Sequence, residues 1–197
     1  MESKLKLRIA VPEDADGILR VYAPYIENTT VTFEYEVPTV EEFRARIAKV
    51  LERYPYIVCE DDGVIVGYTY ASAMGTREAW MWSAESSIYV DAATRGRGIG
   101  TMLYGALEEL LTAMGIAGVY ARISLPDLGS VGFHEARGYV SCGVMERCGY
   151  KLGRWLDLVT MKKELAAAGE TPAAPIWFSE LDRTDIETIL ERMKNNG

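Results

Sequence analysis

In Ser86-Ser87-Ile88-Tyr89-Val90-Asp91-Ala92-Ala93-Thr94-Arg95-Gly96-Arg97-Gly98-Ile99-Gly100-Thr101-Met102-Leu103-Tyr104, an alternating strand ends, and two arginines follow among three glycines at the start of a helix. Glycine permits positive φ and a close approach of the backbone to a ligand. The start of a helix adds unpaired N–H groups and the positive end of the helix dipole. This strand–loop–helix pattern predicts an anion site suited to a pyrophosphate.

Two familiar phosphate-binding motifs do not match this stretch. A P-loop has Lys-Ser or Lys-Thr after its last glycine, and neither pair follows Gly100. The dinucleotide fingerprint G-x-G-x-x-G fails at Thr101, where it needs a glycine. The pattern that fits is Arg-x-x-Gly-x-Gly, formed by Arg95, Gly98 and Gly100. It resembles the acetyl-CoA pyrophosphate loop of the GNAT superfamily of N-acetyltransferases.

Four further segments narrow this resemblance to one family. They are Tyr54-Pro55-Tyr56-Ile57-Val58, Trp82-Ser83-Ala84-Glu85-Ser86-Ser87-Ile88-Tyr89-Val90, His134-Glu135-Ala136-Arg137-Gly138-Tyr139 and Gly153-Arg154-Trp155-Leu156-Asp157. In this order they resemble the phosphinothricin acetyltransferase family, whose members acetylate the amino group of small amino-acid-like compounds. The resemblance covers residues 5–163 and implies a mixed α/β (α+β) fold, in which helices flank a mixed, mostly antiparallel sheet.

Composition indicates a cytoplasmic enzyme. The chain has 197 residues and a formal net charge of −8, which argues against a nucleic-acid partner because phosphate backbones are bound by basic surfaces. No apolar run is long enough for a membrane span, and the charged start Met1–Lys6 does not resemble a signal peptide. The three cysteines lack the spacing of metal ligands, so we expect free thiols and no metal.

Local patterns predict one acetyltransferase domain over residues 1–165, a linker over 166–175 and a C-terminal helical tail over 176–197. The tail is expected to pack on this domain or on a second copy rather than to have a separate function. Thr39 and Glu42 form a capping box that begins a helix. Asp61-Asp62-Gly63 predicts a hairpin turn. The other expected elements include strands at Leu5–Ile9, Tyr56–Glu60, Val64–Tyr70, Val119–Ile123 and Trp155–Lys162, and a short helix at Ser130–Arg137.

The resemblance assigns the cofactor contacts. The backbone at the end of the strand Ile88-Tyr89-Val90 is expected to pair with the pantetheine arm and to donate N–H groups to the oxyanion of the tetrahedral intermediate. Asp127 and Ser130 are expected in the second half of the cleft. Asp127 replaces an asparagine common in the family, and an aspartate repels an anionic ligand. The remaining predicted cofactor residues are Arg95, Gly96, Arg97, Gly98, Ile99, Gly100 and Thr101.

Acetyl transfer to an amine needs a base, because an ammonium group has no lone pair. In the resembling family this role belongs to the glutamate of the Trp-x-Ala-Glu segment, which is Glu85 in this sequence. The alternative is a structural glutamate that caps a neighbouring strand or helix.

Coenzyme A leaves as a thiolate, so an acid is also needed. His134, the only histidine, stands where many GNAT enzymes have a tyrosine. Its alternative role is a hydrogen bond to a backbone carbonyl.

An amino-acid acceptor carries a carboxylate, for which an arginine is a suitable partner. Arg77 matches an arginine of the family, and it lies eight residues before Glu85. Lys151 and Arg154 are further basic candidates. Phe33, Thr76 and Trp82 complete the predicted acceptor site, together with Trp80 as a possible pocket residue. Arg77 has an alternative role as a brace for the loop that contains the tryptophans, and aromatic residues more often belong to a core.

Two hypotheses of function follow. The first is an N-acetyltransferase that uses acetyl-CoA on a small amine, an amino acid or an amino-acid analogue of the phosphinothricin, methionine sulfone or methionine sulfoximine type. The chain is then expected to form a homodimer. The second is a non-catalytic acyl-CoA-binding module that recruits a partner through its C-terminal helix. The presence of Glu85, Arg95, Gly98, Gly100 and His134 together favours the enzyme.

Overall fold

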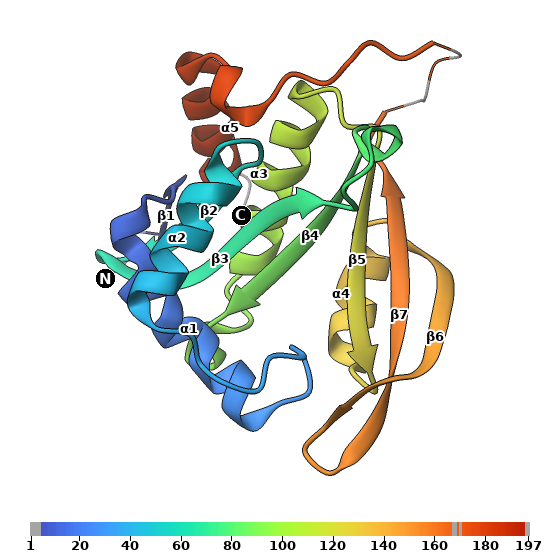
Figure 1. Ribbon diagram of the computed structural model, residues 1–197. Helices are drawn as coiled ribbons and strands as arrows, with labels where there is room; N and C mark the ends of the chain where they lie inside the picture. The colour runs from blue at the N-terminus through green and yellow to red at the C-terminus, as the bar shows by residue number, and fades with distance from the viewer. Residues whose placement is uncertain (1–4, 167–168, 170, 196–197) are drawn as a thin grey trace.

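A seven-stranded sheet forms the centre of the molecule (Figure 1). The computed structural model describes residues 5–166, 169 and 171–195. The strands follow the order β1-β2-β3-β4-β5-β7-β6, and only the β4–β5 pair is parallel. The expected mixed, mostly antiparallel sheet with flanking helices is therefore confirmed. The strands are β1 (Leu5–Ile9), β2 (Tyr56–Asp61), β3 (Val64–Ala73), β4 (Ser83–Val90), β5 (Gly118–Leu125), β6 (Val140–Lys151) and β7 (Arg154–Glu164).

Helices cover both faces of this sheet. Helices α1 (Ala15–Asn28) and α2 (Val40–Leu51) pack on one face, against Tyr56, Val58 and Tyr68. Helices α3 (Ile99–Ala113) and α5 (Arg183–Asn195) lie on the other face, and α4 (Leu128–Ala136) lies beside β5. Four short 3-10 helices connect these elements: η1 (Pro12–Asp14), η2 (Glu78–Trp80), η3 (Ala92–Thr94) and η4 (Phe178–Glu180).

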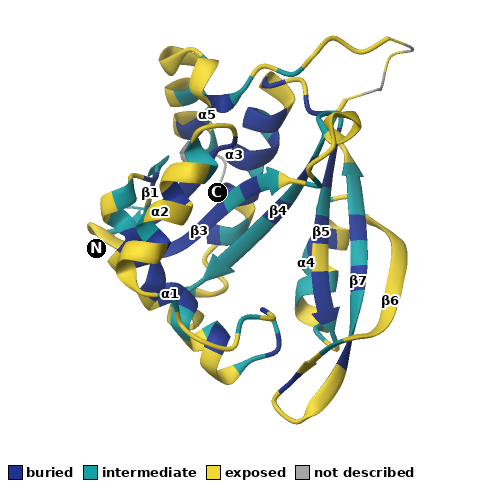
Figure 2. Ribbon diagram, viewed as in Figure 1, coloured by how far each residue is buried: buried dark blue, intermediate teal, exposed yellow. Residues whose placement is uncertain are grey.

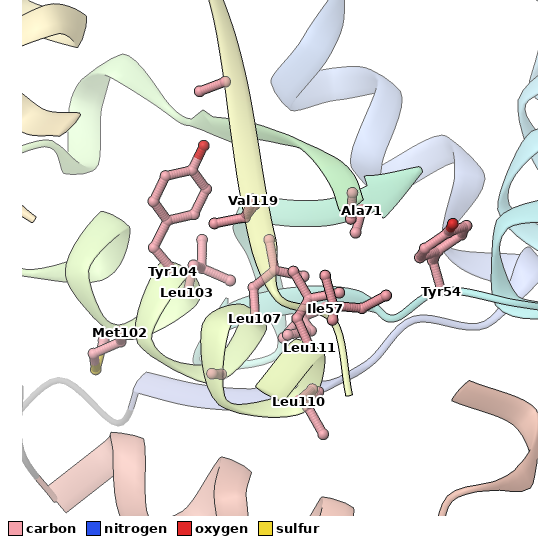
Figure 3. Close-up of a cluster of buried hydrophobic side chains, with 14 of the residues drawn as sticks. Tyr54, Ile57, Ala71, Met102, Leu103, Tyr104, Leu107, Leu110, Leu111 and Val119 are labelled. Atoms are coloured by element: carbon pink, nitrogen blue, oxygen red, sulfur yellow. The ribbon is translucent and has the colours of Figure 1, made fainter. Parts of the chain in front are cut away.

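The apolar face of α3 forms a large part of the hydrophobic core. Leu103, Leu107, Leu110 and Leu111 are buried against strand residues such as Ile57 (Figure 3). Leu103, Leu107 and Leu110 recur at three- and four-residue intervals, the period of one helix face. This packing fixes the start of α3, and therefore the glycine loop, against the end of β4.

Two local predictions are confirmed in atomic detail. Thr39 begins α2 with a capping box, because its backbone N–H donates to Glu42 Oε2 at 2.8 Å while its Oγ1 accepts from the Glu42 N–H at 3.2 Å. The β2–β3 hairpin turns at Asp62 and Gly63, whose φ angles of 50° and 83° are both positive. A third element differs from its prediction: α4 begins at Leu128 rather than Ser130, because Asp127 is its N-cap.

The parallel strands β4 and β5 separate part-way along their length. They pair from Ser83 with Gly118 to Ser86 with Ala121, and β4 then continues to Val90 without pairing to β5. Alternate residues of β4 point to opposite faces. Ala84 and Ser86 face α3, whereas Tyr89 packs on Tyr22 of α1 with ring centroids 4.7 Å apart. Glu85 lies four residues before Tyr89 on the same strand, so its side chain also projects from the α1–α2 face.

The C-terminal residues pack on the same domain, with α5 against α3 and β1 (Figure 1). Phe178 and Leu190 are buried in the core. Met193 lies over Gly105 of α3, where an added Cβ would come within 2.6 Å of its Sδ. Residues 167, 168 and 170 of the predicted linker, and residues 196–197 of the predicted tail, lie outside the described residues.

Candidate active site

The glycine loop borders a cavity of about 500 Å³ at the start of α3. The predicted residues Ile88, Val90 and Arg95 contribute to its wall, and Asp127 and Ser130 reach it from α4. Its other lining residues are Tyr25, Val31, Thr94, Gly96, Gly98, Ile99, Gly100, Thr101, Gly129 and Phe133. The structure thus brings together most of the residues predicted to hold acetyl-CoA.

The glycines of the loop serve different purposes. Gly98 is the N-cap of α3 and has φ 76°, a left-handed conformation that glycine adopts without strain. Gly100 is already helical, and a Cβ there would lie 3.2 Å from the ring of Phe133. The loop therefore keeps the first N–H groups of α3 open toward the cavity, as an anion site requires.

The two arginines of the loop have different partners. Arg95 lines the cavity, and its Nη2 donates to the Tyr25 hydroxyl at 2.9 Å. That hydroxyl in turn donates to the Val90 carbonyl at 2.6 Å. Arg97 instead pairs with Asp61 of β2 at 2.6 Å, which ties the loop to the β2–β3 hairpin. Arg95 is therefore the arginine placed to meet an anion in the cavity.

Asp127 has a structural role that the sequence did not reveal. Its Oδ1 accepts a hydrogen bond from the Ser130 N–H at 3.0 Å and so caps α4. A carboxylate is favoured at a helix N-terminus, where it meets unpaired N–H groups and the positive end of the dipole. The carboxylate that replaces the family's asparagine is therefore compensated by the helix itself.

Tyr89 is not among the residues that line the glycine-loop cavity. Its ring packs on the opposite face of the sheet, against Tyr22 and Tyr25. Ile88 lines the cavity with its side chain. Since β4 does not pair with β5 beyond Ser86, this stretch of its backbone offers an unpaired edge to an extended ligand.

Glu85 forms an ion pair with Arg122 of β5. Nε of Arg122 donates to Oε1 of Glu85 at 2.8 Å, and Nη2 donates to Oε2. These hydrogen bonds raise the pKa of Arg122 above its ordinary value. The Glu85 side chain is 16% exposed and that of Arg122 is 46% exposed, so Arg122 is the more accessible member of the pair. Sequence reasoning missed Arg122, because only the register of the parallel pair brings it beside Glu85.

His134 is buried, with 3% of its surface exposed. Nδ1 lies 2.7 Å from the Ser130 carbonyl oxygen, and Nε2 lies 3.0 Å from the Tyr104 hydroxyl. Burial lowers the pKa of His134, so the ring is neutral at pH 7. A neutral ring donates from Nδ1 to the carbonyl and therefore accepts from Tyr104 at Nε2. The backbone hydrogen bond considered as an alternative role is present.

The hydrogen bonds of His134 continue through the core. The Tyr104 hydroxyl lies 3.1 Å from Ser86 Oγ, and the Tyr120 carbonyl lies 3.2 Å from the same Oγ. Because the Tyr104 O–H donates to His134, Ser86 is the donor to the Tyr104 oxygen or to the Tyr120 carbonyl. A small cavity of about 60 Å³ is lined by Glu85, Tyr104 and His134. It shares the lining residues Ile88 and Ser130 with the glycine-loop cavity. Both predicted catalytic residues thus border one space next to the separation of β4 from β5.

Phe33 belongs to the α1–α2 connection, which is fastened to the β6–β7 hairpin. Its ring lies over Gly149, where an added Cβ would come within 2.5 Å. The buried Lys151 donates to the Thr32 carbonyl at 2.8 Å, and burial lowers the pKa of this lysine. Arg154 donates to Thr30 Oγ1 at 3.3 Å. These contacts hold Phe33 at the hairpin. Lys151 and Arg154, two of the basic side chains considered for the acceptor carboxylate, are thus hydrogen-bonded to the α1–α2 connection.

The structure does not bring Thr76, Arg77 and Trp82 to either cavity. Thr76 and Arg77 are exposed in the β3–β4 connection, next to η2. The Trp82 indole donates to the Ala173 carbonyl at 2.8 Å and so points toward the C-terminal segment. This connection joins the end of β4 that lies away from the glycine loop (Figure 1).

A further cavity of about 650 Å³ opens on the α1–α2 face, the face from which Glu85 projects. Tyr56 and Tyr70 form part of its wall with their rings stacked 5.0 Å apart. Ser72, the β3 partner of Glu85, borders it as well. The buried Tyr56 hydroxyl has no hydrogen-bond partner among the described residues. Sequence reasoning missed this cavity, for which the alternation of Tyr68 and Tyr70 on β3 is a signal in the sequence.

The described residues contain no group of three or more His, Cys, Asp or Glu side chains arranged to hold a metal ion. None of the described helices combines the length and apolar character of a membrane span. Cys59 is buried, and burial raises the pKa of its thiol to about 12.

Comparisons with known proteins agree with this arrangement. A family model for the acetyltransferase (GNAT) domain matches residues 7–160. A phosphinothricin N-acetyltransferase of Streptomyces viridochromogenes is 34% identical over 171 residues, which cover 87% of this chain and 91% of that protein. An L-methionine sulfoximine/L-methionine sulfone acetyltransferase of Pseudomonas paraeruginosa is 32% identical, with 84% and 98% covered.

Solved structures share the fold. A GNAT superfamily phosphinothricin acetyltransferase from Sinorhizobium meliloti, crystallised in complex with acetyl-CoA, superposes with a TM-score of 0.81. It is 34% identical, and the match covers 88% of this chain and 94% of that one. A Salmonella typhimurium acetyltransferase with its cofactor acetyl-CoA has a TM-score of 0.80 at 26% identity, with 86% and 98% covered. The chain therefore belongs to the GNAT family of N-acetyltransferases and has phosphinothricin N-acetyltransferases among its homologues.

Proposed function

We propose that this enzyme transfers the acetyl group of acetyl-CoA to the amino group of a small amino acid or amino-acid analogue, with Glu85 as the general base. The observation that carries the proposal is the position of Glu85. It borders a small cavity that shares lining residues with the glycine-loop cavity, at the point where β4 separates from β5. The names of the relatives support phosphinothricin, methionine sulfoximine and methionine sulfone as acceptors to test.

The residues present fit acetyl-CoA. The N–H groups at the start of α3 and the Arg95 guanidinium supply positive potential for the pyrophosphate. The unpaired edge of β4 beyond Ser86 suits the extended pantetheine arm. N–H groups of this edge are the proposed donors to the oxyanion, a contribution of about 3–4 kcal/mol in comparable acyl transfers.

The acceptor approaches from the α1–α2 face, on which Glu85 lies. Glu85 takes a proton from the ammonium group, directly or through a water, so that the neutral amine can attack the acetyl carbonyl. We propose that the leaving thiolate is protonated through Tyr104, whose hydroxyl is hydrogen-bonded to His134. The Tyr104 O–H, which donates to Nε2 of His134 in this structure, must turn toward the sulfur as the thiolate leaves. We propose that His134 positions Tyr104 for this transfer, because its Nδ1–H is held by the Ser130 carbonyl.

The alternative of a binding module that recruits a partner through the C-terminal helix has less support. Leu190 of α5 is buried in the core, and Met193 packs on Gly105 of α3. These apolar side chains are therefore used within the domain.

We propose that any second copy binds along β6, the edge strand beside β7, which exposes Val140, Val144 and Met145 (Figure 2). Light scattering on the purified protein should then give twice the monomer mass, whereas a monomer mass would contradict the homodimer.

The proposal is tested by following thiol release from acetyl-CoA with a panel of acceptors. The panel contains phosphinothricin, L-methionine sulfoximine, L-methionine sulfone, proteinogenic amino acids and simple amines. We expect rapid thiol release with at least one compound that carries both an amino group and a carboxylate. Thiol release no faster than the buffer blank with every acceptor, from a protein that binds acetyl-CoA, would contradict the proposal.

A further inference from the structure

We infer that Arg122 binds the carboxylate of the acceptor, and that the acceptor frees Glu85 by drawing this arginine away from it. The inference rests on the proposed function, because it assumes Glu85 as the base and an amino acid as the acceptor. It makes Arg122 a specificity-determining residue. It also explains how Glu85, which is ion-paired in this structure, becomes free to accept a proton.

Glu85 and Arg122 form a bidentate pair. Arg122 donates to both carboxylate oxygens of Glu85, a bidentate arrangement that holds the carboxylate as a planar partner. A proton accepted by Glu85 would leave Arg122 without its counter-charge. A base in this position therefore needs a second anion that takes over the guanidinium at the moment of reaction.

The covalent structure of an α-amino acid limits where its carboxylate can bind. The amino group and the carboxylate of an α-amino acid are attached to the same carbon, so the group that binds the carboxylate must lie next to the base. Arg122 meets this condition through its contact with Glu85. Its side chain is 46% exposed, and it is the more accessible member of the pair. Its planar guanidinium can pass from one carboxylate to another without loss of hydrogen bonds.

The other basic side chains near the cleft meet this condition less well. Arg77 is exposed in the β3–β4 connection and lines neither of the two cavities. Lys151 is buried and donates to the Thr32 carbonyl, and Arg154 contacts Thr30. Arg46 is paired with Glu34 at 2.8 Å. Arg122 is therefore the described cation in direct contact with the proposed base.

The resulting step conserves atoms and charge. The acceptor enters as a zwitterion, and its carboxylate takes the guanidinium of Arg122. Glu85 accepts one proton from the ammonium group. The neutral nitrogen forms the N–C bond to the acetyl carbon, and the C–S bond of the thioester breaks. Tyr104 donates its proton to the departing sulfur, and the second proton of the nitrogen replaces it, which leaves an acetamide and a free thiol. Deprotonation of Glu85 restores its pair with Arg122.

Arg122→Gln tests the inference, with one good acceptor compared against its carboxamide and its decarboxylated amine. For the wild type we expect kcat/KM for the acid to exceed that for the other two by about 100-fold. In Arg122→Gln, kcat/KM for the acid should fall about 100-fold. The values for the carboxamide and the amine should stay the same or increase, because Glu85 is no longer paired with an arginine. Arg122→Lys should lose less, since it retains the charge without the planar geometry. Arg44→Gln, which removes an arginine paired with Glu41 on α2, is the matched control and should change nothing.

A second readout separates this inference from the proposed function. Calorimetry with free coenzyme A present measures binding of the N-acetylated acid and of its carboxamide, and it needs no turnover. We expect tighter binding of the acid by the wild type and by Arg122→Lys, and equal binding by Arg122→Gln. If the wild type binds the acid no better than the carboxamide, or if Arg122→Gln keeps the preference, the inference is overturned. Selective acid binding without acetylation would overturn only the proposed function.

Discussion

Nε2 of His134 on α4 and the hydroxyl of Tyr104 on α3 are 3.0 Å apart in the core beneath the β4–β5 separation. This contact joins a titratable ring to a hydroxyl that also reaches Ser86 of β4. Two helices are thereby locked to the strand that carries Glu85. We therefore expect substitutions in this hydrogen-bonded chain to change both the stability of the fold and the rate of turnover.

Stability should fall when the pH drops below about 6.5. Burial lowers the pKa of His134 from its ordinary value of 6.5, so the unfolded chain binds a proton in a range where the folded chain does not. Unfolding is then favoured as the pH falls, by at most about 1.4 kcal/mol for each pH unit. Denaturant melts between pH 7.5 and pH 5.5 measure this slope. His134→Asn, which does not titrate, should show a shallower slope, and an equal slope in both proteins would contradict the assignment.

Tyr104→Phe should lower kcat by about 100-fold, because the hydroxyl is the proposed proton donor to the leaving thiolate. The KM for acetyl-CoA should change by less than about threefold, since Tyr104 does not line the glycine-loop cavity. Tyr139→Phe is the matched control, because the Tyr139 hydroxyl is also buried near His134 but has no hydrogen-bond partner among the described residues. Equal turnover in the two variants would show that Tyr104 is only structural.

The two arginines of the glycine loop should differ in their effect on cofactor binding. Arg95→Ala removes the guanidinium that lines the cavity, and the Kd for acetyl-CoA should rise at least about tenfold. Arg97→Ala should have a smaller effect, since Arg97 is held by Asp61. Calorimetric titration with acetyl-CoA measures both. A larger loss in Arg97→Ala would mean that the loop rearranges when the cofactor binds.

Gly98→Ala should destabilise the fold by about 1–2 kcal/mol, because φ is 76° at this position and a Cβ is strained there. Gly98→Asn should recover part of this loss, since asparagine tolerates the left-handed region. Gly132→Ala in α4 is the control. Its Cβ would meet nothing within 4 Å in a helix, so this variant should be as stable as the wild type or more stable. Thermal melts rank the three, and equal melting temperatures for Gly98→Ala and Gly132→Ala would refute the strain at Gly98.

The features that sequence predicted correctly are local ones. The capping box of Thr39 and Glu42 and the turn at Asp62-Gly63 depend on residues within four positions of one another. The glycine loop is local as well, since a strand end and a helix start enclose it. Such patterns carry their own structural cause, so they can be interpreted before the fold is known.

The features that sequence missed depend on register between distant strands. Arg122 lies 37 residues beyond Glu85, and only the parallel pairing of Ser86 with Ala121 brings it alongside. The contact of Phe33 with Gly149 is also between residues far apart in the sequence, but it joins the α1–α2 connection to β6. The hydrogen bond from the Trp82 indole to the Ala173 carbonyl also joins distant residues, because Ala173 lies in a segment beyond the resemblance.

The central claim is acetyl transfer to an amine with Glu85 as the base, and the most direct test is the turnover number of Glu85→Gln as a function of pH. Glutamine keeps the shape of the side chain and cannot accept the proton. The account predicts a loss of about 100-fold or more at pH 7, an unchanged Kd for acetyl-CoA, and a smaller deficit near pH 10, where the acceptor amine is already neutral. Glu41→Gln on the surface of α2 serves as the control. Equal turnover of the wild type and Glu85→Gln at pH 7 would contradict the claim.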